Sequence, residues 1–299
     1  MGKSSWKWNE FNKVHNNNDL EGYLYNREFE HSNYYHYTTA KAVDSILSGN
    51  SFWVSNVSGF NDTIDKKQFG NEEKFCFSLC FSTGTSENLP LWYLYSGING
   101  KGARISISKS SIQCLVQEST FKLCELNDNK TIASSFAPIT LDREKDLVCT
   151  FRDVLYYNQV VEGKTRLKYN TMTNNDFPDS EFNKYKERHS GFCKSLIWFY
   201  EKETRLVLRL NSEIRKKIDS TKKYVIVMKF NEAMRKKMKI TFAPNVTKSD
   251  MENIEKEYTN ISNFLHASSK VALSDYSGTV NFNICGNCEH RTSNASKEN

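Results

Sequence analysis

The chain has 299 residues, of which 38% are hydrophobic and 25% charged, so it can bury a core and is not a largely disordered polypeptide. No apolar run approaches the roughly 18 residues of a membrane-spanning helix, and the N-terminus lacks the apolar segment of a signal peptide. We therefore expect a soluble, cytoplasmic protein. The net charge is +6, and residues 202–239 alone carry thirteen Lys or Arg against four acidic residues.

The eight cysteines are scattered through the chain, which in a cytosolic protein is typical of small buried thiols rather than disulfides. Cys285 and Cys288, with His290 close by, have the spacing of metal ligands. A structural zinc site needs four ligands, and no second pair follows in the sequence. We expect no metal site.

The N-terminal third predicts alternating strands and helices. Residues 1–33 read as an arm packed on the body of the protein, and residues 34–37 as an aromatic strand that ends at Thr38 and Thr39, either of which can cap a helix over 40–47. A second strand is expected at 51–55. Asn61 and Asp62 follow in a turn-rich loop, where they either line a pocket or make the turn.

A nearly continuous apolar run at 75–82 is typical of a strand covered on both faces. The pattern at 91–95 predicts a helical turn that places Trp92 and Tyr95 on one face, either as core residues or as a stacking wall for a flat ring. An alternating strand is expected at 103–107.

Residues 109–148 show weak strands that we do not assign to elements. Further along, the patterns predict strands, helices and a loop as follows: strands at 153–161, 224–230, 239–243 and 271–273, helices at 180–199, 212–218, 231–238 and 249–265, and a loop at 162–178.

The segment after the 180–199 helix has an unusual charge pattern. Glu201, Glu203 and Arg205 alternate with other residues, so on a strand that begins by Glu201 they share one face opposite a leucine face. Either this is an edge strand whose Glu–Arg pairs face water, or the charges belong to a functional site.

These pieces together resemble a family of bacterial domains, described as uncharacterised, that carries the same ordered signature. In this chain the signature reads HYTTAKAVDSILSG, FWVS, FND, CFS, LWYLY with a Gly-rich turn, WFYEKETRLV and ITFAPNVTKSDMENI. The resemblance implies membership of the ADP-ribosyltransferase superfamily. It implies an α+β fold, a split β-sandwich with flanking helices, over residues 34–275, with 1–33 as the arm and 276–299 as a C-terminal tail.

The same resemblance implies the residues of an NAD site. His36 hydrogen-bonds a ribose of NAD, with Tyr37 and Thr38 beside it. Tyr95 stacks on the nicotinamide with Trp92 or Tyr37 as its neighbour.

The acidic pair supplies the chemistry that the resemblance implies. Glu203 is the preferred catalytic carboxylate, stabilising the oxocarbenium-like state as nicotinamide leaves, and Glu201 positions or deprotonates the acceptor. Arg205 either binds the pyrophosphate or pairs with a glutamate.

The leading hypothesis is therefore an NAD-dependent ADP-ribosyltransferase acting on a protein or nucleic acid, as a toxin or anti-phage defence effector with a possible antitoxin or regulatory partner. The basic segment 202–239 favours RNA or DNA as the acceptor. One alternative is NAD hydrolysis, with water as the acceptor. Another is an inactive nucleic-acid-binding or regulatory protein that uses the basic 202–239 face.

Overall fold

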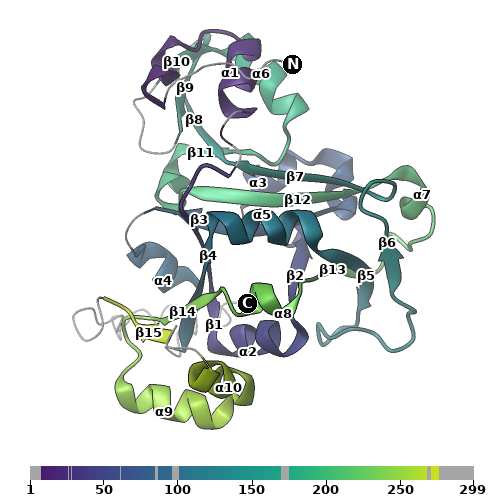
Figure 1. Cartoon of the computed structure of the whole chain (residues 1–299). Helices are drawn as coiled ribbons and strands as arrows, with labels where there is room; N and C mark the ends of the chain where they lie inside the picture. The colour runs from purple at the N-terminus through teal and green to yellow at the C-terminus, as the bar shows by residue number, and fades with distance from the viewer. Residues whose placement is uncertain are drawn as a thin grey trace, which may run out of the picture.

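Two β-sheets organise the chain, a large one of eleven strands and a small one of four, and helices pack around both (Figure 1). The computed structural model describes residues 8–25, 27, 29–60, 62–84, 87–95, 101–169, 175–267 and 271–275. The fold is α+β, as the sequence led us to expect.

The large sheet has neighbouring strands that are mostly antiparallel. Its main path runs β15 (Val271–Leu273), β14 (Lys239–Phe242), β4 (Gly102–Ser108), β1 (Asn33–Thr39), β3 (Cys76–Thr83), β2 (Ser51–Asn56), β13 (Lys223–Lys229), β5 (Thr120–Leu126) and β6 (Ile139–Leu141). A branch leaves this path at β3, which also pairs with β12 (Glu203–Leu210), and β12 pairs with β7 (Leu147–Asp153).

The branch at β3 splits the sheet. Along one edge β3 pairs with β12 over nearly its whole length, from Cys76 to Ser82. Along the other edge it pairs with β2 only at Phe77 and Ser78, and with β1 only at Ser82 and Thr83. Strands β1 and β2 therefore diverge between these points, and a gap opens beside the middle of β3.

Helices cover the large sheet on its flanks. The helix α2 (Ala40–Gly49) packs on β1, β2 and β4, and α10 (Thr259–Ala267) packs on α2. The remaining helical segments of this part are η2 (Val57–Gly59), α3 (Thr63–Lys67), η3 (Gly70–Phe75), α4 (Leu89–Tyr95), α5 (Lys109–Glu118), η4 (Leu196–Glu201), α7 (Ser212–Arg215), α8 (Glu232–Arg235) and α9 (Lys248–Glu257).

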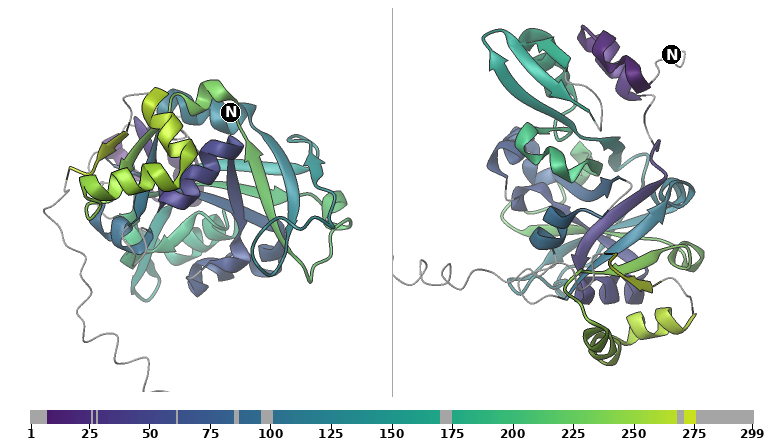
Figure 2. Two further views of the ribbon diagram at one scale, coloured as in Figure 1. Left: turned by 90° about the horizontal axis from the view of Figure 1, so that it is seen from below. Right: turned by 90° about the vertical axis from the view of Figure 1, so that its left-hand side faces the viewer.

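The small sheet forms an upper lobe with the N-terminal segment (Figures 1 and 2). Its strand order is β10 (Asn175–Pro178), β9 (Lys164–Lys168), β8 (Leu155–Val161) and β11 (Cys193–Ser195), with β11 parallel to β8. The helices η1 (Trp8–Lys13), α1 (Asn17–Tyr25) and α6 (Asp179–Arg188) complete the lobe. It has its own apolar core, to which the first two helical segments and the sheet both contribute.

Several predicted elements are confirmed. The strand and helix expected from 34 to 47 are β1 and α2, with Thr39 as the N-cap, and the apolar run at 75–82 is β3. The strands expected at 51–55, 103–107, 153–161, 224–230, 239–243 and 271–273 are present within two residues of their predicted bounds, and short helices stand at 212–218 and 231–238.

Three predictions are wrong for identifiable reasons. The loop expected at 162–178 contains β9 and β10, because their polar outward residues hid the alternation. The helix expected at 180–199 ends at Arg188, since His189 leaves the helical conformation (φ −116°, ψ 43°) and Gly191 follows with a φ of 86°. The strand β11 and the helix η4 come next. The helix expected at 249–265 is two helices, α9 and α10, which are separated at Tyr258, where the backbone is extended. The N-cap of α9 is Thr247 rather than Ser249. The unassigned stretch 109–148 holds α5, β5, β6 and the start of β7.

Some predictions lie outside the described residues: Asn61, Gly97, Gly100, the Cys285–Cys288–His290 cluster and the C-terminal tail from 276. The described cysteines, Cys76, Cys80, Cys114, Cys124, Cys149 and Cys193, are free thiols. Among the described helices, none combines the length and the apolar character that crossing a membrane requires.

Candidate active site

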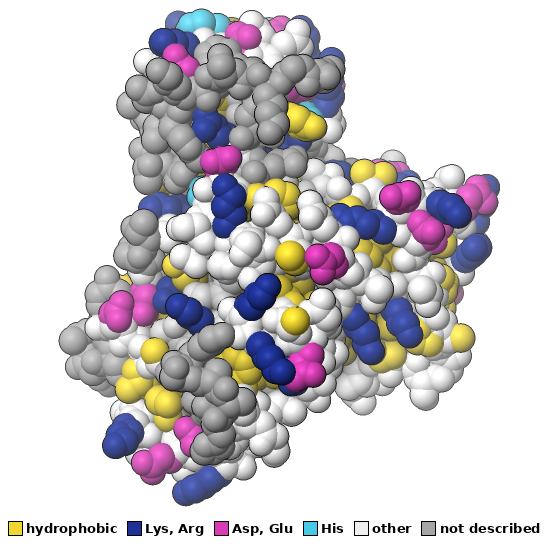
Figure 3. Space-filling view, viewed as in Figure 1, with side chains coloured by type: hydrophobic (Ala, Val, Ile, Leu, Met, Phe, Trp, Pro, Cys, Tyr) yellow, Lys and Arg dark blue, Asp and Glu magenta, His cyan; other side chains and the backbone are white. Residues whose placement is uncertain are grey.

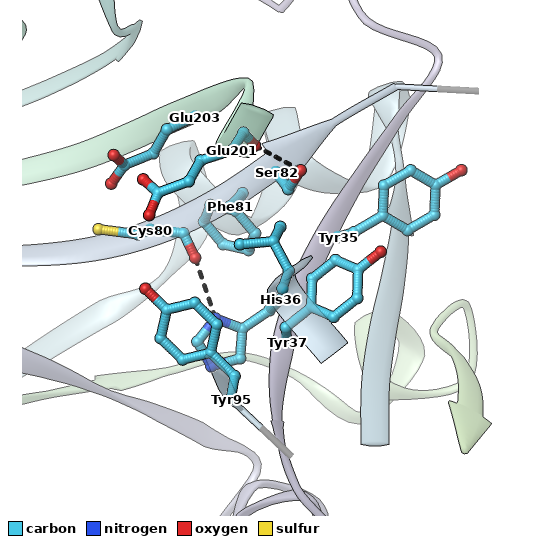
Figure 4. A pocket seen from close by; sticks show the side chains of 10 residues that line it. Tyr35, His36, Tyr37, Cys80, Phe81, Ser82, Tyr95, Glu201 and Glu203 are labelled. Carbon is cyan, nitrogen blue, oxygen red and sulfur yellow. Dashed lines mark hydrogen bonds between the residues drawn. The ribbon is translucent and has the colours of Figure 1, made fainter. Parts of the chain in front are cut away.

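The gap beside β3 is where the predicted histidine lies. Because β1 has moved away from β3 there, the His36 ring reaches across, and its Nδ1 lies 3.0 Å from the carbonyl oxygen of Cys80 (Figure 4). The ring packs edge-on against Phe52 and Phe81, which fix its plane. A side chain thus occupies the space where a neighbouring strand would otherwise pair.

This contact determines which nitrogen of His36 carries the proton. A carbonyl oxygen only accepts, so Nδ1 must be the donor. Burial lowers the pKa of His36, although the bond to Cys80 acts in the opposite direction, so the ring is neutral near pH 7. In the neutral ring, Nε2 is then an acceptor available to a hydroxyl group.

Glu203 belongs to a buried ion network at the start of β12. Its Oε1 accepts from Nε of Arg205 at 2.8 Å and its Oε2 from Nη2 at 2.8 Å. Lys194 Nζ lies 3.2 Å from Oε2. Three N–H groups thus bind the carboxylate, one at Oε1 and two at Oε2, so the protein holds Glu203 at both of its oxygens.

Arg205 is equally engaged and is only 1% exposed. Besides Glu203, its Nη1 donates to Asp65 Oδ1 at 2.8 Å and to the Gly191 carbonyl at 2.9 Å, and its Nη2 donates to Asp65 Oδ2 at 2.5 Å. A guanidinium has five N–H groups, and all five are used here. Of the two roles expected for Arg205, the pairing with a glutamate is the one present, and no N–H group remains for a pyrophosphate.

Glu201 differs from Glu203 although only one residue separates them. It ends η4 rather than lying on β12, and Lys202 between them takes a left-handed φ of 43°. The expectation of a strand that begins by Glu201 is therefore wrong. The turn still brings both carboxylates to one ammonium, because Lys194 Nζ lies 2.5 Å from Oε2 of Glu201.

The two glutamates have opposite acidities. Burial, with a smaller effect from the Glu203 charge, raises the pKa of Glu201 to about 7, while Lys194 moderates the rise. Burial also opposes ionisation of Glu203, but the Arg205 and Lys194 charges outweigh it and hold that pKa far below its ordinary range. Within the described residues, Lys194 is the one donor to the Glu201 carboxylate, which leaves Oε1 of Glu201 open to a ligand.

A cleft connects these groups. A narrow recess lined by His36, Cys80, Tyr95, Glu201 and Glu203 opens into a cleft of about 750 Å³ that shares the same five residues. This volume is within the range of small-molecule and cofactor sites. Figure 4 shows the two carboxylates side by side, with that of Glu201 nearer to Tyr95 than that of Glu203.

The predicted aromatic residues separate into a cleft residue and core residues. Tyr95, on α4, is 48% exposed and lines the cleft. Trp92 is fully buried, its Nε1 donates to Glu87 at 2.8 Å, and its ring packs edge-on against Tyr37. Trp92 is therefore a core residue and not part of a stacking wall, because the helical turn of α4 sits with Trp92 inward.

Tyr37 and Thr38 lie at the C-terminal half of β1, next to His36, and both line the cleft. The Tyr37 hydroxyl accepts from the Asn88 backbone N–H at 3.0 Å and from Arg104 Nη1 at 3.2 Å, so it is fixed in place. Asp62 lines the cleft as well and also makes the turn, since its Oδ1 caps α3. Both roles considered for Asp62 are thus present.

The basic segment 202–239 does not form one continuous face. Arg205 is buried in the ion network, and Arg209 donates to the Ser190 carbonyl oxygen and to its hydroxyl. The remaining lysines and arginines divide between α7, α8 and the strands around them, and several pair with acidic neighbours. On the face shown in Figure 3, basic side chains stand apart from one another with acidic and apolar groups between them.

Two members of the network, Lys194 and Asp65, were not identified from the sequence. Lys194 is 7% exposed and Asp65 2% exposed, which is unusual for charged residues and indicates a paired role. Neither lies near Glu203 in a recognisable motif. Among the described residues, no group of three or more His, Cys, Asp or Glu is placed to hold a metal ion.

Comparison with known proteins gives a structural likeness and no sequence match. No protein-family model and no curated protein matches the chain. Solved structures that are similar include those of Thermus sp. 2.9 DarT in complex with carba-NAD+ (11% identity, 83% of this chain, 97% of that chain, TM-score 0.32), with NAD+ (12%, 83%, 96%, 0.32) and with ADP-ribosylated ssDNA (11%, 83%, 95%, 0.34).

Proposed function

We propose that the protein is an NAD-dependent ADP-ribosyltransferase, which cleaves nicotinamide from NAD and transfers ADP-ribose to a macromolecular acceptor. The observation that carries this proposal is the set of groups around one cleft: a neutral histidine with a free acceptor nitrogen, an exposed tyrosine ring and a carboxylate. The ordered signature in the sequence supports the same reading. The split of the large sheet at β3 accords with the expected ADP-ribosyltransferase-like split β-sandwich over residues 34–275.

We assign the catalytic carboxylate to Glu201, which reverses the preference drawn from the sequence. Arg205 and Lys194 place three donors on the two oxygens of Glu203, whereas Glu201 keeps Oε1 open toward the recess. As the bond between nicotinamide and the ribose C1 breaks, positive charge develops on the ribose. An ionised Glu201 that accepts a hydrogen bond from a ribose hydroxyl stabilises that charge where it forms.

The other cleft residues bind and orient NAD. Nε2 of His36 accepts a hydrogen bond from a ribose hydroxyl, and the buried position of the ring fixes where that hydroxyl lies. Tyr95 presents its ring to the nicotinamide, and Tyr37 and Thr38 form the adjacent wall. The leaving nicotinamide takes the electron pair of the broken bond, and an oxygen or nitrogen of the acceptor forms the new bond to C1 while losing its proton.

The acceptor distinguishes the leading function from its alternative. With a nucleic acid or protein as acceptor the enzyme is a transferase, and with water it is an NAD hydrolase. The resemblance also carries the proposal of a cytoplasmic toxin or anti-phage effector. The distributed basic residues of 202–239 weaken the case for an inactive protein that binds nucleic acid through one basic face.

The test is the release of nicotinamide from NAD by the full chain, with and without added RNA, DNA and cell lysate. Glu201→Gln and His36→Ala are expected to lower release at least a hundredfold, whereas Glu252→Gln, an exposed glutamate on α9, leaves it unchanged. Thermal melting shows whether each variant is folded. Label from adenine-labelled NAD retained on a macromolecule identifies transfer, and free ADP-ribose identifies hydrolysis.

Two outcomes contradict the proposal. One is no nicotinamide release under any of these conditions. The other is release that persists in the folded Glu201→Gln protein.

A further inference from the structure

The small upper lobe contributes a residue to the cleft that belongs to the large sheet. Lys194 is the central residue of β11, paired in parallel with Tyr156 of β8. Strand β8 in turn belongs to the core that the lobe shares with α1, through Leu155. The position of the Lys194 backbone is therefore set by the small sheet, while its side chain ends among the two glutamates.

The contacts of the Lys194 ammonium are nearly all made with the site. Nζ lies 2.5 Å from Oε2 of Glu201, 3.2 Å from Oε2 of Glu203, and 5.0 Å from the centre of the Trp198 ring. An ammonium has three donors, and two carboxylates and an aromatic face take up its directions. At 7% exposure the group has little water to replace any of these partners.

The two cations of the network bind their carboxylates in different ways. Arg205 holds Glu203 and Asp65, each through two parallel hydrogen bonds, which suits a planar guanidinium. Lys194 binds both glutamates through its single Nζ atom, which suits a compact ammonium. Among the residues that the structure describes, Glu203 thus pairs with two cations and Glu201 with Lys194 alone.

We propose that Lys194 is a positioning residue for Glu201: its ammonium, supplied by the small sheet, keeps the Glu201 carboxylate charged and directs its open oxygen into the recess. This inference rests on the proposed function for its catalytic consequence. Glu203 and Arg205 then serve to hold Lys194 in place, since Glu203 bridges the two cations.

The acidity of Glu201 depends on every charged or titratable group that surrounds it. These are Lys194 from β11, Glu203 and Arg205 from β12, Tyr95 from α4, Tyr156 from β8, Tyr200 from η4, Cys80 from β3 and His36 from β1. Lys194 is the nearest cation among them. Its removal therefore makes Glu201 harder to ionise, and only the ionised form accepts the ribose hydrogen bond.

The test compares NAD cleavage from pH 5.5 to 9.5 for the wild type, Lys194→Met, Lys194→Arg and the control Lys164→Met, an exposed lysine in the same lobe. For Lys194→Met we expect the acidic limb of kcat to move up by about one to three pH units. Activity then falls about tenfold or more at pH 7 and recovers toward pH 9, with the KM for NAD within about twofold. Lys194→Arg and Lys164→Met keep the wild-type limb.

A second measurement follows the titration of Glu201 directly, without NAD turnover. The carboxyl carbons of glutamate are labelled with ¹³C, Glu201 is assigned by its loss in Glu201→Gln, and its titration is followed by NMR in the wild type and in Lys194→Met. We expect the midpoint to rise in the variant by the amount that the kinetic limb moves. If Lys194→Met does not fold, Lys194→Gln replaces it.

The outcomes separate the two proposals. A folded Lys194→Met protein whose Glu201 titrates as in the wild type overturns the positioning role. So does a loss of activity that is uniform across pH. If the wild type cleaves no NAD, the proposed function fails, while the NMR titration still decides whether Lys194 controls Glu201.

Discussion

Replacing Glu201 with glutamine is expected to abolish NAD cleavage and to make the folded protein more stable, most of all above pH 7. Few substitutions produce both effects. The reason is that the buried network carries three carboxylates, on Asp65, Glu201 and Glu203, against two cations, Lys194 and Arg205. Glutamine keeps the shape of Glu201 and an oxygen for Lys194, and it removes the charge that is in excess.

The size of the effect follows from the acidity of Glu201. Its pKa rises from the ordinary 4.5 to about 7 on folding. A group whose pKa is raised in the folded state binds its proton more tightly there, so its contribution to stability is present at low pH and is lost as the pH rises through about 7. At 1.36 kcal/mol per pKa unit, the raised pKa of Glu201 lowers the free energy of unfolding by about 1 kcal/mol at pH 5 and about 3 kcal/mol at pH 8.

The assay is urea unfolding and thermal melting of the wild type and Glu201→Gln at pH 5 and pH 8. We expect the variant to be more stable at both values, with the larger gain at pH 8. Glu252→Gln, exposed on α9, is the matched control and should match the wild type at both. Glu203→Gln should act in the opposite direction and destabilise the fold by about 3 kcal/mol, because it takes one partner from the buried Arg205.

Two results would refute this reasoning. If Glu201→Gln is destabilised at pH 8, the carboxylate contributes to stability and is not strained by its surroundings. If its gain is the same at pH 5 and pH 8, the effect does not come from ionisation. If Glu201→Gln is more stable than the wild type and has lost activity, Glu201 is a catalytic group that lowers the stability of the folded protein.

Three further predictions address other parts of the structure. The kcat/KM of the wild type for NAD should rise about tenfold per pH unit below pH 7 and level off above it, since only ionised Glu201 is active; a flat profile from pH 5 to 8 would exclude this. Gly191→Ala should lower the free energy of unfolding in urea by at least about 2 kcal/mol, because a Cβ at a φ of 86° would overlap the Phe69 ring. Equal stability of variant and wild type would show that the Phe69 ring can move aside without cost. Trp92→Phe should lower the free energy of unfolding by about 1 to 2 kcal/mol, because Glu87 loses a buried donor, and it should leave the KM for NAD unchanged. A raised KM would instead indicate that Trp92 contacts the ligand.

Local sequence patterns were sufficient to predict most strands of the large sheet. The aromatic run at β1, the continuous apolar run at β3 and the alternation in β12 are each typical of strands, and a cap or glycine marks where they end. The same local reading brought out His36, Tyr95 and the Glu-x-Glu-x-Arg stretch. Side-chain period and charge are properties of neighbouring residues, so they can be read along a single segment.

The tertiary structure decided what these residues can do. Arg205 binds Asp65, which lies 140 residues away. Lys194 lies on a strand of the small sheet and binds Glu201 at the end of η4. The gap that admits His36 exists only because β1 and β2 diverge from β3. Which glutamate keeps an oxygen free for a ligand depends on these distant partners, because each donor that the protein supplies takes an acceptor position from the ligand. No pattern within one segment records which positions are taken.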